Sequence, residues 1–283
     1  MFYEKDLRLS HTLEDYRLKG KIISKHKFAF FKFVCYNIQR LGEYIMINFN
    51  NKDNFDLYLK RLLFLGMGSQ GVCYLDKKNK IVYKVFHGYF ANEDEGYKSE
   101  DILKFSNIKN GTFIWPNDVV YVDDRLIGYT MPYVASNNLC DTDLLSTDLN
   151  IFERSIEKSY NDIEILTKNN VCLYDVMYNI LCGNGKINVI DTMEYSYGNT
   201  SLKKNIAAFD IEIRYFLVDD YFDVFVNSDT LLKEMYYDKK NVTSLEFLRV
   251  FRNKLSEYIG TDVDKLEKAK KLVMKLDDPY YIR

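Results

Sequence analysis

The sequence predicts an α+β fold in which a β-rich part comes first and an α-rich part follows. Short β-prone segments bounded by polar turns recur between residues 44 and 133. After Leu139 the apolar residues change to the spacing of amphipathic helices. Only 3 prolines are present and no Ser/Gly-rich run occurs, so the sequence shows no flexible linker between the two parts. We therefore expect two lobes in close contact.

Three parts are expected along the chain. Residues 1–60 form an N-terminal extension without a phosphate-binding motif, to which the sequence assigns no role, although residues 44–49 alternate as a strand does. Residues 61–134 form the β-rich lobe, including a helix expected between residues 92 and 105 with Ile102, Leu103 and Phe105 facing inward. Residues 135–283 form the α-rich lobe, with one helix capped by Asp148 and another that begins at Thr243 or Ser244 and stops at Gly260.

The composition excludes several classes of partner. The chain has 283 residues and a formal net charge of −2, so it has no global electrostatic attraction to nucleic acid or to an anionic membrane. Its longest apolar cluster is far shorter than the roughly 20 residues of a membrane span, and its first residues lack a signal-peptide pattern. The 5 widely spread cysteines indicate reduced thiols and no cysteine metal site, as expected of a cytoplasmic protein.

A glycine-rich segment is the most informative local feature. Gly66, Gly68 and Gly71 would let backbone N–H groups approach a phosphate chain, and Lys84 would bring a positive charge to it. A dinucleotide-binding fold would need these glycines to open a helix. Here Val72 begins a β-prone run, and a polar turn follows before a second strand that carries Lys84. The segment therefore predicts a strand hairpin, with a plain glycine-rich hairpin and an exposed lysine as the alternative.

A second motif places carboxylates and an amide in a short stretch. Asp175 precedes Asn179 by four residues, and Asp191 closes the apolar run of residues 187–190 after a Gly-Asn-Gly-Lys turn. Mg²⁺ prefers oxygen ligands of these types, whereas Asp and Asn also stabilise ordinary turns through side-chain hydrogen bonds. For Asp191 the second interpretation is weaker, because a carboxylate at the end of a buried strand needs a partner.

In this order, the glycine loop, the lysine and the Asp-Asn-Asp series resemble the protein-kinase-like superfamily over roughly residues 62–195. The chain is identified as a divergent, bacterial-type member with an atypical catalytic loop. The resemblance implies a two-lobed fold with a β-rich N-lobe and an α-rich C-lobe, and ATP and Mg²⁺ as cofactors.

The resemblance also assigns roles to residues. Gly66, Gly68, Gly71 and Val72 would cover the nucleotide. Lys84 would hold the α- and β-phosphates and be oriented by Glu100, with Glu95 as the second choice.

In the catalytic loop, Asn179 and Asp191 would hold Mg²⁺, and Asp175 would accept the proton of the substrate hydroxyl. A third segment that resembles the hinge between kinase lobes places Met131 at the gatekeeper position. The backbone groups of Pro132 and Val134 would then bind adenine.

The chain also departs from the family pattern. Leu173-Tyr174 replaces the His-Arg that usually precedes the catalytic aspartate, the Asp175–Asn179 spacing is four instead of five, and Thr192-Met193 replaces Phe-Gly. No Ala-Pro-Glu motif follows, and the short remainder of the chain favours a reduced peptide-docking surface.

The expected function is therefore an ATP- and Mg²⁺-dependent kinase that transfers the γ-phosphate to a hydroxyl of an unknown acceptor, either a protein Ser/Thr or a small molecule. The main alternative is a pseudokinase that binds nucleotide or serves as an interaction module. Transfer of a nucleotide instead of a phosphate is a third possibility.

Overall fold

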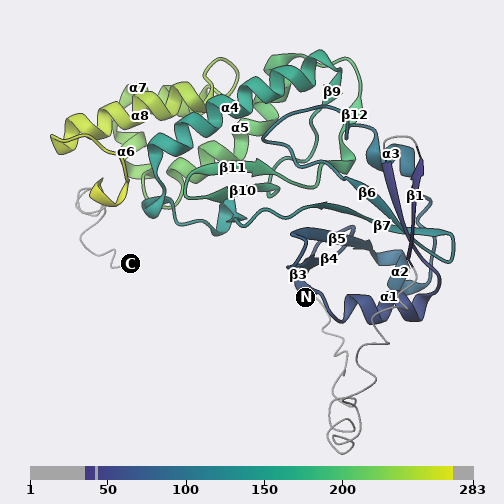
Figure 1. Ribbon diagram of the computed structural model, residues 1–283. Coiled ribbons are helices and arrows are strands. Elements are labelled where there is room, and N and C mark those ends of the chain that lie inside the picture. Colours follow the sequence, from purple (N-terminus) through teal and green to yellow (C-terminus); the bar gives the residue numbers. More distant parts are fainter. Residues whose placement is uncertain (1–35, 42–43, 270–283) are drawn as a thin grey trace, which may run out of the picture.

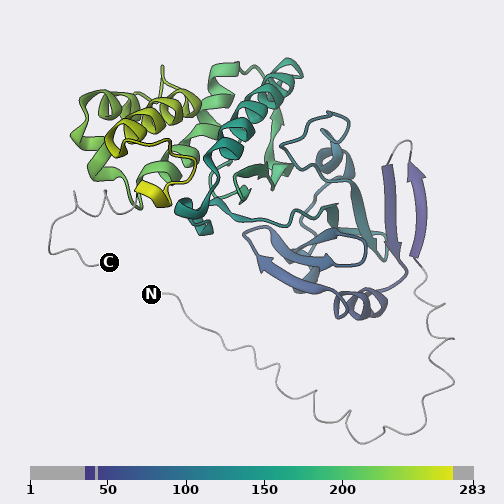
Figure 2. The ribbon, with the colours of Figure 1, turned by 60° about the vertical axis from the view of Figure 1, so that its left-hand side comes forward.

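The computed structural model describes residues 36–41 and 44–269. A β-rich N-terminal portion is followed by a helical C-terminal portion, so the two-lobed α+β architecture expected from the sequence is confirmed (Figure 1). A second view shows that the large sheet and the helices of the C-terminal portion occupy separate ends of the molecule (Figure 2).

One seven-stranded sheet dominates the β-rich lobe. All neighbouring strands pair antiparallel except β2 and β6, which run parallel. In spatial order the strands are β1 (Tyr36–Leu41), β2 (Tyr44–Phe49), β6 (Asp118–Val122), β7 (Arg125–Pro132), β5 (Ile81–Phe86), β4 (Gly71–Asp76) and β3 (Leu63–Met67). Residues 44–49 are thus a strand, as their alternation predicts.

The described part of the expected N-terminal extension belongs to this sheet. Strands β1 and β2 continue it beyond β6, and helix α1 (Lys52–Leu59) packs on one face. Phe55 of α1 is fully buried in one cluster with Val85 and Val120 of the lobe. The boundary expected between residues 60 and 61 therefore does not separate two units here, because strand pairing and a shared apolar core join them.

The helix expected over residues 92–105 is much shorter in the structure. Helix α2 (His87–Ala91) ends where Asn92 adopts a left-handed φ of 60°, and helix α3 (Ser99–Leu103) covers little more than one turn. A left-handed residue ends a helix because the chain leaves the right-handed path there. The expectation that Ile102 and Leu103 face inward is confirmed, since both are buried.

In the part of the chain that the structure describes, five α-helices form most of the helical lobe. They are α4 (Leu149–Lys168), α5 (Leu202–Val218), α6 (Asp223–Ser228), α7 (Thr230–Tyr237) and α8 (Ser244–Ile259). Asp148 caps α4 by accepting a hydrogen bond from the Ile151 N–H at 2.9 Å, as predicted. Helix α8 begins after Thr243 and ends at Gly260, which has a φ of 77°, and both ends are as predicted. The structure adds a capping box at the start, formed by Thr243 and Glu246.

Short strands complete this lobe. They are β8 (Asn137–Asn138), β9 (Val171–Cys172), β10 (Ile180–Gly183), β11 (Lys186–Val189) and β12 (Ser196–Tyr197). Strand β10 pairs with β8 and β11, and β9 pairs with β12. Three 3-10 helices lie between them: η2 (Leu139–Asp141), η3 (Leu144–Ser146) and η4 (Thr192–Glu194).

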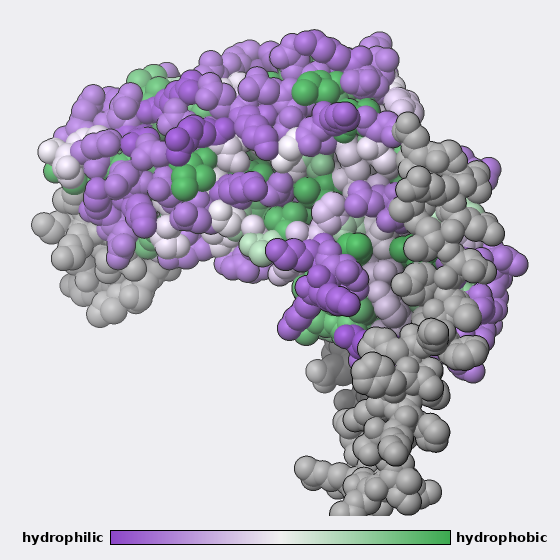
Figure 3. Space-filling view, in the orientation of Figure 1, coloured by the Kyte–Doolittle hydropathy of each residue, from purple (hydrophilic) through white to green (hydrophobic). Residues whose placement is uncertain are grey.

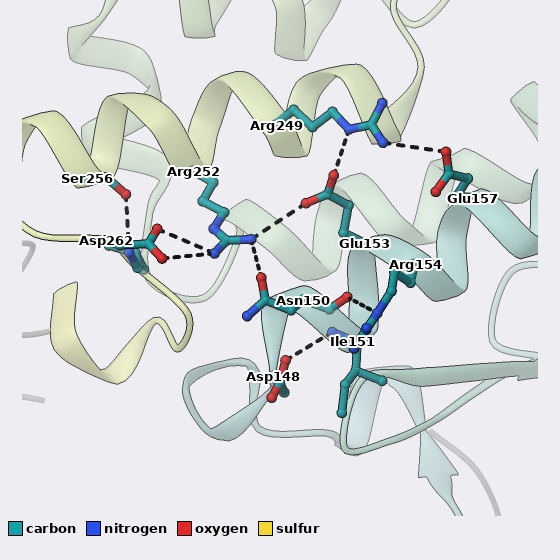
Figure 4. Close-up of polar contacts among 11 residues, drawn as sticks. Asp148, Asn150, Ile151, Glu153, Arg154, Glu157, Arg249, Arg252, Ser256 and Asp262 are labelled. Carbon is teal, nitrogen blue, oxygen red and sulfur yellow. Dashed lines mark hydrogen bonds and ion pairs between the residues drawn. The ribbon is translucent and has the colours of Figure 1, made fainter.

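A network of polar contacts joins α4 to α8 on the surface of the helical lobe (Figure 4). Glu153 of α4 accepts a hydrogen bond from Arg249 Nε at 2.7 Å and lies 3.6 Å from Arg252 Nη1. Ion pairs at a surface contribute little individually, and the burial of Phe152 and Phe251 in one apolar cluster of this lobe contributes more to its stability. No helix within the described ranges is long and apolar enough to cross a membrane.

Candidate active site

The glycine segment forms the strand hairpin that its sequence predicts. Strands β3 and β4 meet at a turn in which the Gly68 N–H donates to the Gly71 carbonyl at 2.9 Å. The turn is tied to α2, because the His87 N–H donates to the Gln70 carbonyl at 3.2 Å and a His87 ring nitrogen lies 2.8 Å from the Gly68 carbonyl. The loop is therefore held in place by its own hairpin and by the residue that follows β5.

Packing requires a glycine at only one of the three positions, Gly71. A Cβ at Gly71 would lie 2.2 Å from the Val85 carbonyl oxygen, so the close approach of β4 to β5 excludes a side chain there. A Cβ at Gly66 or Gly68 would meet no atom within 4 Å. Packing within the described chain thus accounts for Gly71 and leaves the space above Gly66 and Gly68 open to a ligand. Val72, beside Gly71, is buried in β4 opposite Val85.

Lys84 is the cation of the site and is almost completely buried. Its side chain is 5% exposed and forms an ion pair with the carboxylate of Asp191, 107 residues later in the chain. Its ammonium group also donates to Gln70 Oε1 at 2.6 Å. The amide nitrogen of Gln70 in turn donates to Glu194 Oε1 at 2.6 Å. The tip of the glycine loop is therefore linked to both the lysine and the segment after Asp191.

The partner expected for Lys84 was Glu100, and the structure corrects this. Glu100 is exposed at the start of α3, and no ion pair joins it to Lys84 among the residues the structure describes. Glu95, the second choice, accepts a hydrogen bond from the Gly88 N–H instead. Because residues 92–98 are not helical, no long helix presents a glutamate to Lys84.

The hinge-like segment begins at the end of β7. Met131 is buried opposite Val82 of β5, whereas Pro132 is exposed and Val134 is half-buried. The Thr130 carbonyl accepts a hydrogen bond from the Asn117 N–H at 2.8 Å, on the edge of β7 away from β5. Carbonyl directions alternate along a strand, so the Pro132 carbonyl lies on that same edge. The Val134 carbonyl already accepts a hydrogen bond from the Ser136 N–H at 3.0 Å. Of the two backbone groups of Val134, the N–H is therefore the one to consider for a ligand.

Asp175 and Asn179 form one turn between β9 and β10. Asn179 Nδ2 donates to the Asp175 carbonyl at 2.7 Å, and the Asn179 N–H donates to the Val176 carbonyl at 3.0 Å. The Asp175 side chain is exposed, and its backbone is left-handed with a φ of 47°. The alternative that these residues stabilise a turn is therefore correct for their backbone contacts. It leaves the Asp175 carboxylate and the Asn179 amide oxygen available for chemistry.

The turn brings Asn179 next to Asp191. The Asn179 carbonyl accepts a hydrogen bond from the Ile190 N–H at 2.9 Å, which extends the pairing of β10 with β11 by one step. Asp191 follows directly and adopts a left-handed φ of 57° before η4. The residues Asn179 and Asp191 thus lie at the same end of one hairpin. They carry an amide oxygen and a carboxylate, which are ligand types that Mg²⁺ takes.

Two residues that the sequence did not single out fix the turn through hydrogen bonds to its backbone. Both lie on α5, seven residues and therefore two turns apart, so they share one face. Asn205 Oδ1 accepts the Leu173 N–H at 3.1 Å, and Glu212 Oε2 accepts the Tyr178 N–H at 2.8 Å. Both side chains are buried, and burial raises the pKa of Glu212. Polar residues at this spacing in an apolar helix are the signal that could have found them.

Tyr195 is a third residue that the sequence did not reveal. Its hydroxyl group is buried without a hydrogen-bond partner in the described part of the chain. Burial, followed by the charges of Asp191 and Asp175, raises the pKa of Tyr195. A neutral O–H donor is therefore present within electrostatic reach of both carboxylates.

Comparisons with known proteins give limited likeness. No protein-family model and no curated protein matches the chain. Among solved structures, it is similar to the crystal structure of the Mycobacterium tuberculosis PknI kinase domain, at 13% sequence identity and a TM-score of 0.44. The similarity covers 68% of this chain and 93% of that chain.

Proposed function

We propose that the protein is an ATP- and Mg²⁺-dependent phosphotransferase that transfers the γ-phosphate to a hydroxyl group. The buried ion pair of Lys84 with Asp191 is the observation that carries this proposal. It joins the strand next to the glycine loop to the hairpin next to the Asp175–Asn179 turn. A cation for phosphates and a carboxylate for a metal ion thus lie together at the meeting point of the two lobes.

The residues present fit a nucleotide with its metal ion. The glycine loop has open space above Gly66 and Gly68, where backbone groups can approach phosphates. The Asp191 carboxylate and the Asn179 amide oxygen would hold Mg²⁺, which would neutralise charge on the phosphates. Lys84 would stay near Asp191 and turn its remaining N–H groups to phosphate oxygens, replacing its present contact with Gln70.

Asp175 would act on the acceptor. Its carboxylate is exposed, and it would orient a hydroxyl and take its proton. Only residues 192–201 separate Asp191 from α5, so little chain is available to cover this side of the site. The acceptor would therefore approach an open site, and we propose a protein Ser/Thr or a small alcohol in that position.

A pseudokinase is the second candidate, and one observation favours it. Lys84 pairs with Asp191 and has no ion pair with Glu100 in the described residues, so the cation is not held by a glutamate of the β-rich lobe. A nucleotide-binding module that does not transfer phosphate would tolerate such an arrangement.

The test is to incubate purified protein with Mg²⁺ and ATP labelled on the γ- or the α-phosphate, with generic protein and small-alcohol acceptors. The Asp175→Ala variant removes the proposed base, and Asp53→Ala, an exposed aspartate on α1, is the matched control. Transfer or release of γ-label that is lost only in Asp175→Ala supports the kinase. Transfer of the α-label indicates nucleotidyl transfer, and ATP binding without either reaction supports the pseudokinase.

A further inference from the structure

A groove in the helical lobe lies apart from the candidate active site. It has a volume of about 780 Å³ and is formed by the start of α5 and the connection between α7 and α8. This volume lies within the range of roughly 300–1,000 Å³ that is usual for binding pockets. The residues of α5 that anchor the Asp175–Asn179 turn are absent from its lining, so it is a separate feature of the same helix.

The groove combines apolar side chains with a set of lysines. Leu202, 38% exposed, and the half-buried Ile206 and Val242 supply apolar surface. Four lysines line it, two from each wall: Lys203, Lys204, Lys239 and Lys240. An exposed leucine among several cations is a surface that suits a partner with both apolar and acidic side chains.

The described part of the chain provides no carboxylate partner for these lysines. Lys203 Nζ lies 3.4 Å from the Asn241 amide oxygen, and Lys239 Nζ contacts the Tyr215 hydroxyl at 3.1 Å, so both contacts are to neutral groups. None of the ion pairs within residues 36–41 and 44–269 involves any of the four. The groove is thus a local concentration of positive charge in a chain whose net charge is −2.

The two acids closest to the groove are already engaged. Asp210 lines it, but its buried carboxylate accepts from the Tyr160 hydroxyl at 2.7 Å and from the Ser244 N–H at 2.8 Å. The Asp238 carboxylate accepts from the Asn241 N–H and side-chain amide at 3.1 to 3.2 Å. These contacts hold the walls of the groove in place, because Asp210 ties α5 to the start of α8 and Asp238 closes the loop between α7 and α8.

We propose that this groove is a docking site for an acidic peptide segment of a partner protein that also carries apolar side chains. Carboxylates of the segment pair with the lysines, and an apolar side chain covers Leu202. The concave shape favours a peptide over a flat anionic membrane, because a narrow chain can follow the concave surface while its charges meet the lysines of both walls. The proposal concerns binding alone and is independent of ATP turnover.

The test starts from a phage-displayed library of short random peptides selected on the purified full chain. The most enriched peptide is synthesised with a fluorescent label, and its Kd is measured by anisotropy. Lys203→Glu/Lys240→Glu reverses charge on both walls, and Leu202→Ser removes apolar surface. Lys77→Glu/Lys78→Glu, in the exposed turn between β4 and β5, makes the same change of net charge elsewhere and is the matched control.

We expect enriched peptides that combine Asp or Glu with apolar residues. The Kd should rise by about tenfold or more in Lys203→Glu/Lys240→Glu and by a few-fold in Leu202→Ser, and it should stay unchanged in the control. Enrichment of peptides without acidic residues, or equal weakening in the control, would overturn the proposal. Binding to phosphatidylserine vesicles that depends on Lys203 and Lys240, with no acidic peptide enriched, would overturn it in favour of a membrane surface.

Discussion

Lys84 and Asp175 belong to the same candidate site, but different parts of the molecule hold them. Lys84 is held by Asp191, whose contact crosses between the lobes, and by Gln70 of the glycine loop in its own lobe. Asp175 lies in a turn whose backbone N–H groups donate hydrogen bonds to the side chains of Asn205 and Glu212 of α5. The phosphate side of the site therefore depends on how the lobes meet, whereas the acceptor side is built within the helical lobe.

The largest effect is expected where the phosphate side depends on one carboxylate. Asp191→Asn removes the counter-ion of Lys84 and the proposed metal ligand together. We expect ATP turnover to fall by about a hundredfold or more, with loss of the Mg²⁺ dependence of ATP binding. Calorimetric titration with and without Mg²⁺, beside a turnover assay, measures both. If the Asp191→Asn variant bound ATP as tightly as the wild type and still required Mg²⁺ to do so, Asp191 would not be a metal ligand.

The free energy of unfolding should depend on pH through Asp210, which lies on α5, the helix that anchors the acceptor side. Burial raises the pKa of Asp210, on α5, to about 6, above its unfolded value of about 3.9. Between these pH values the Asp210 carboxyl binds more protons in the folded protein than in the unfolded chain, so its contribution to the free energy of unfolding falls as the pH rises. The expected loss from this carboxyl is about 2 kcal/mol from pH 4 to pH 6.

Denaturant unfolding of wild type and Asp210→Asn over this pH range isolates that contribution. The variant should gain stability relative to wild type as the pH rises, because it has no carboxylate to ionise. Asp141→Asn, an exposed aspartate in η2, is the control and should follow the wild-type profile. Parallel profiles for wild type and Asp210→Asn would contradict the shift.

Weakening the anchor on α5 should affect the acceptor side alone. Glu212→Ala leaves the Tyr178 N–H without its acceptor, so the turn that carries Asp175 loses a fixed position. We expect kcat to fall by about tenfold with little change in the KM for ATP, and Glu212→Gln to restore part of the rate. Steady-state kinetics provides the comparison. A rise in the KM for ATP with unchanged kcat would mean that Glu212 acts on the phosphate side instead.

The smallest effect should come from the tip of the glycine loop. Gln70→Leu removes the side-chain contacts to Lys84 and Glu194, so ATP no longer competes with Gln70 for the ammonium group. Since a hydrogen bond contributes about 1 kcal/mol net, we expect the Kd for ATP to fall by about fivefold. Ser69→Ala, at the neighbouring exposed position, should leave the Kd unchanged. Weaker binding in Gln70→Leu would indicate that Gln70 itself contacts the nucleotide.

Local sequence patterns predicted the elements that carry the site. The glycine hairpin, the strand of Lys84, the Asp148-capped helix and the helix start at Thr243 all occur as expected. Each depends on alternation, turn chemistry or capping within a few residues, which a sequence shows directly. The helix expected over residues 92–105 failed for residues 92–98, because the apolar positions Ile102, Leu103 and Phe105 further along did not reveal the left-handed Asn92 that ends α2.

The sequence by itself determined which residue types face the site and in what order they follow, from the glycines through Lys84 to Asp175, Asn179 and Asp191. Only the tertiary structure decided their partners. Lys84 pairs with Asp191 across 107 residues, and Gln70 reaches Glu194 across 124. The physical reason is that local hydrogen bonding fixes strands, turns and caps, whereas the choice of a distant partner depends on how the two lobes pack.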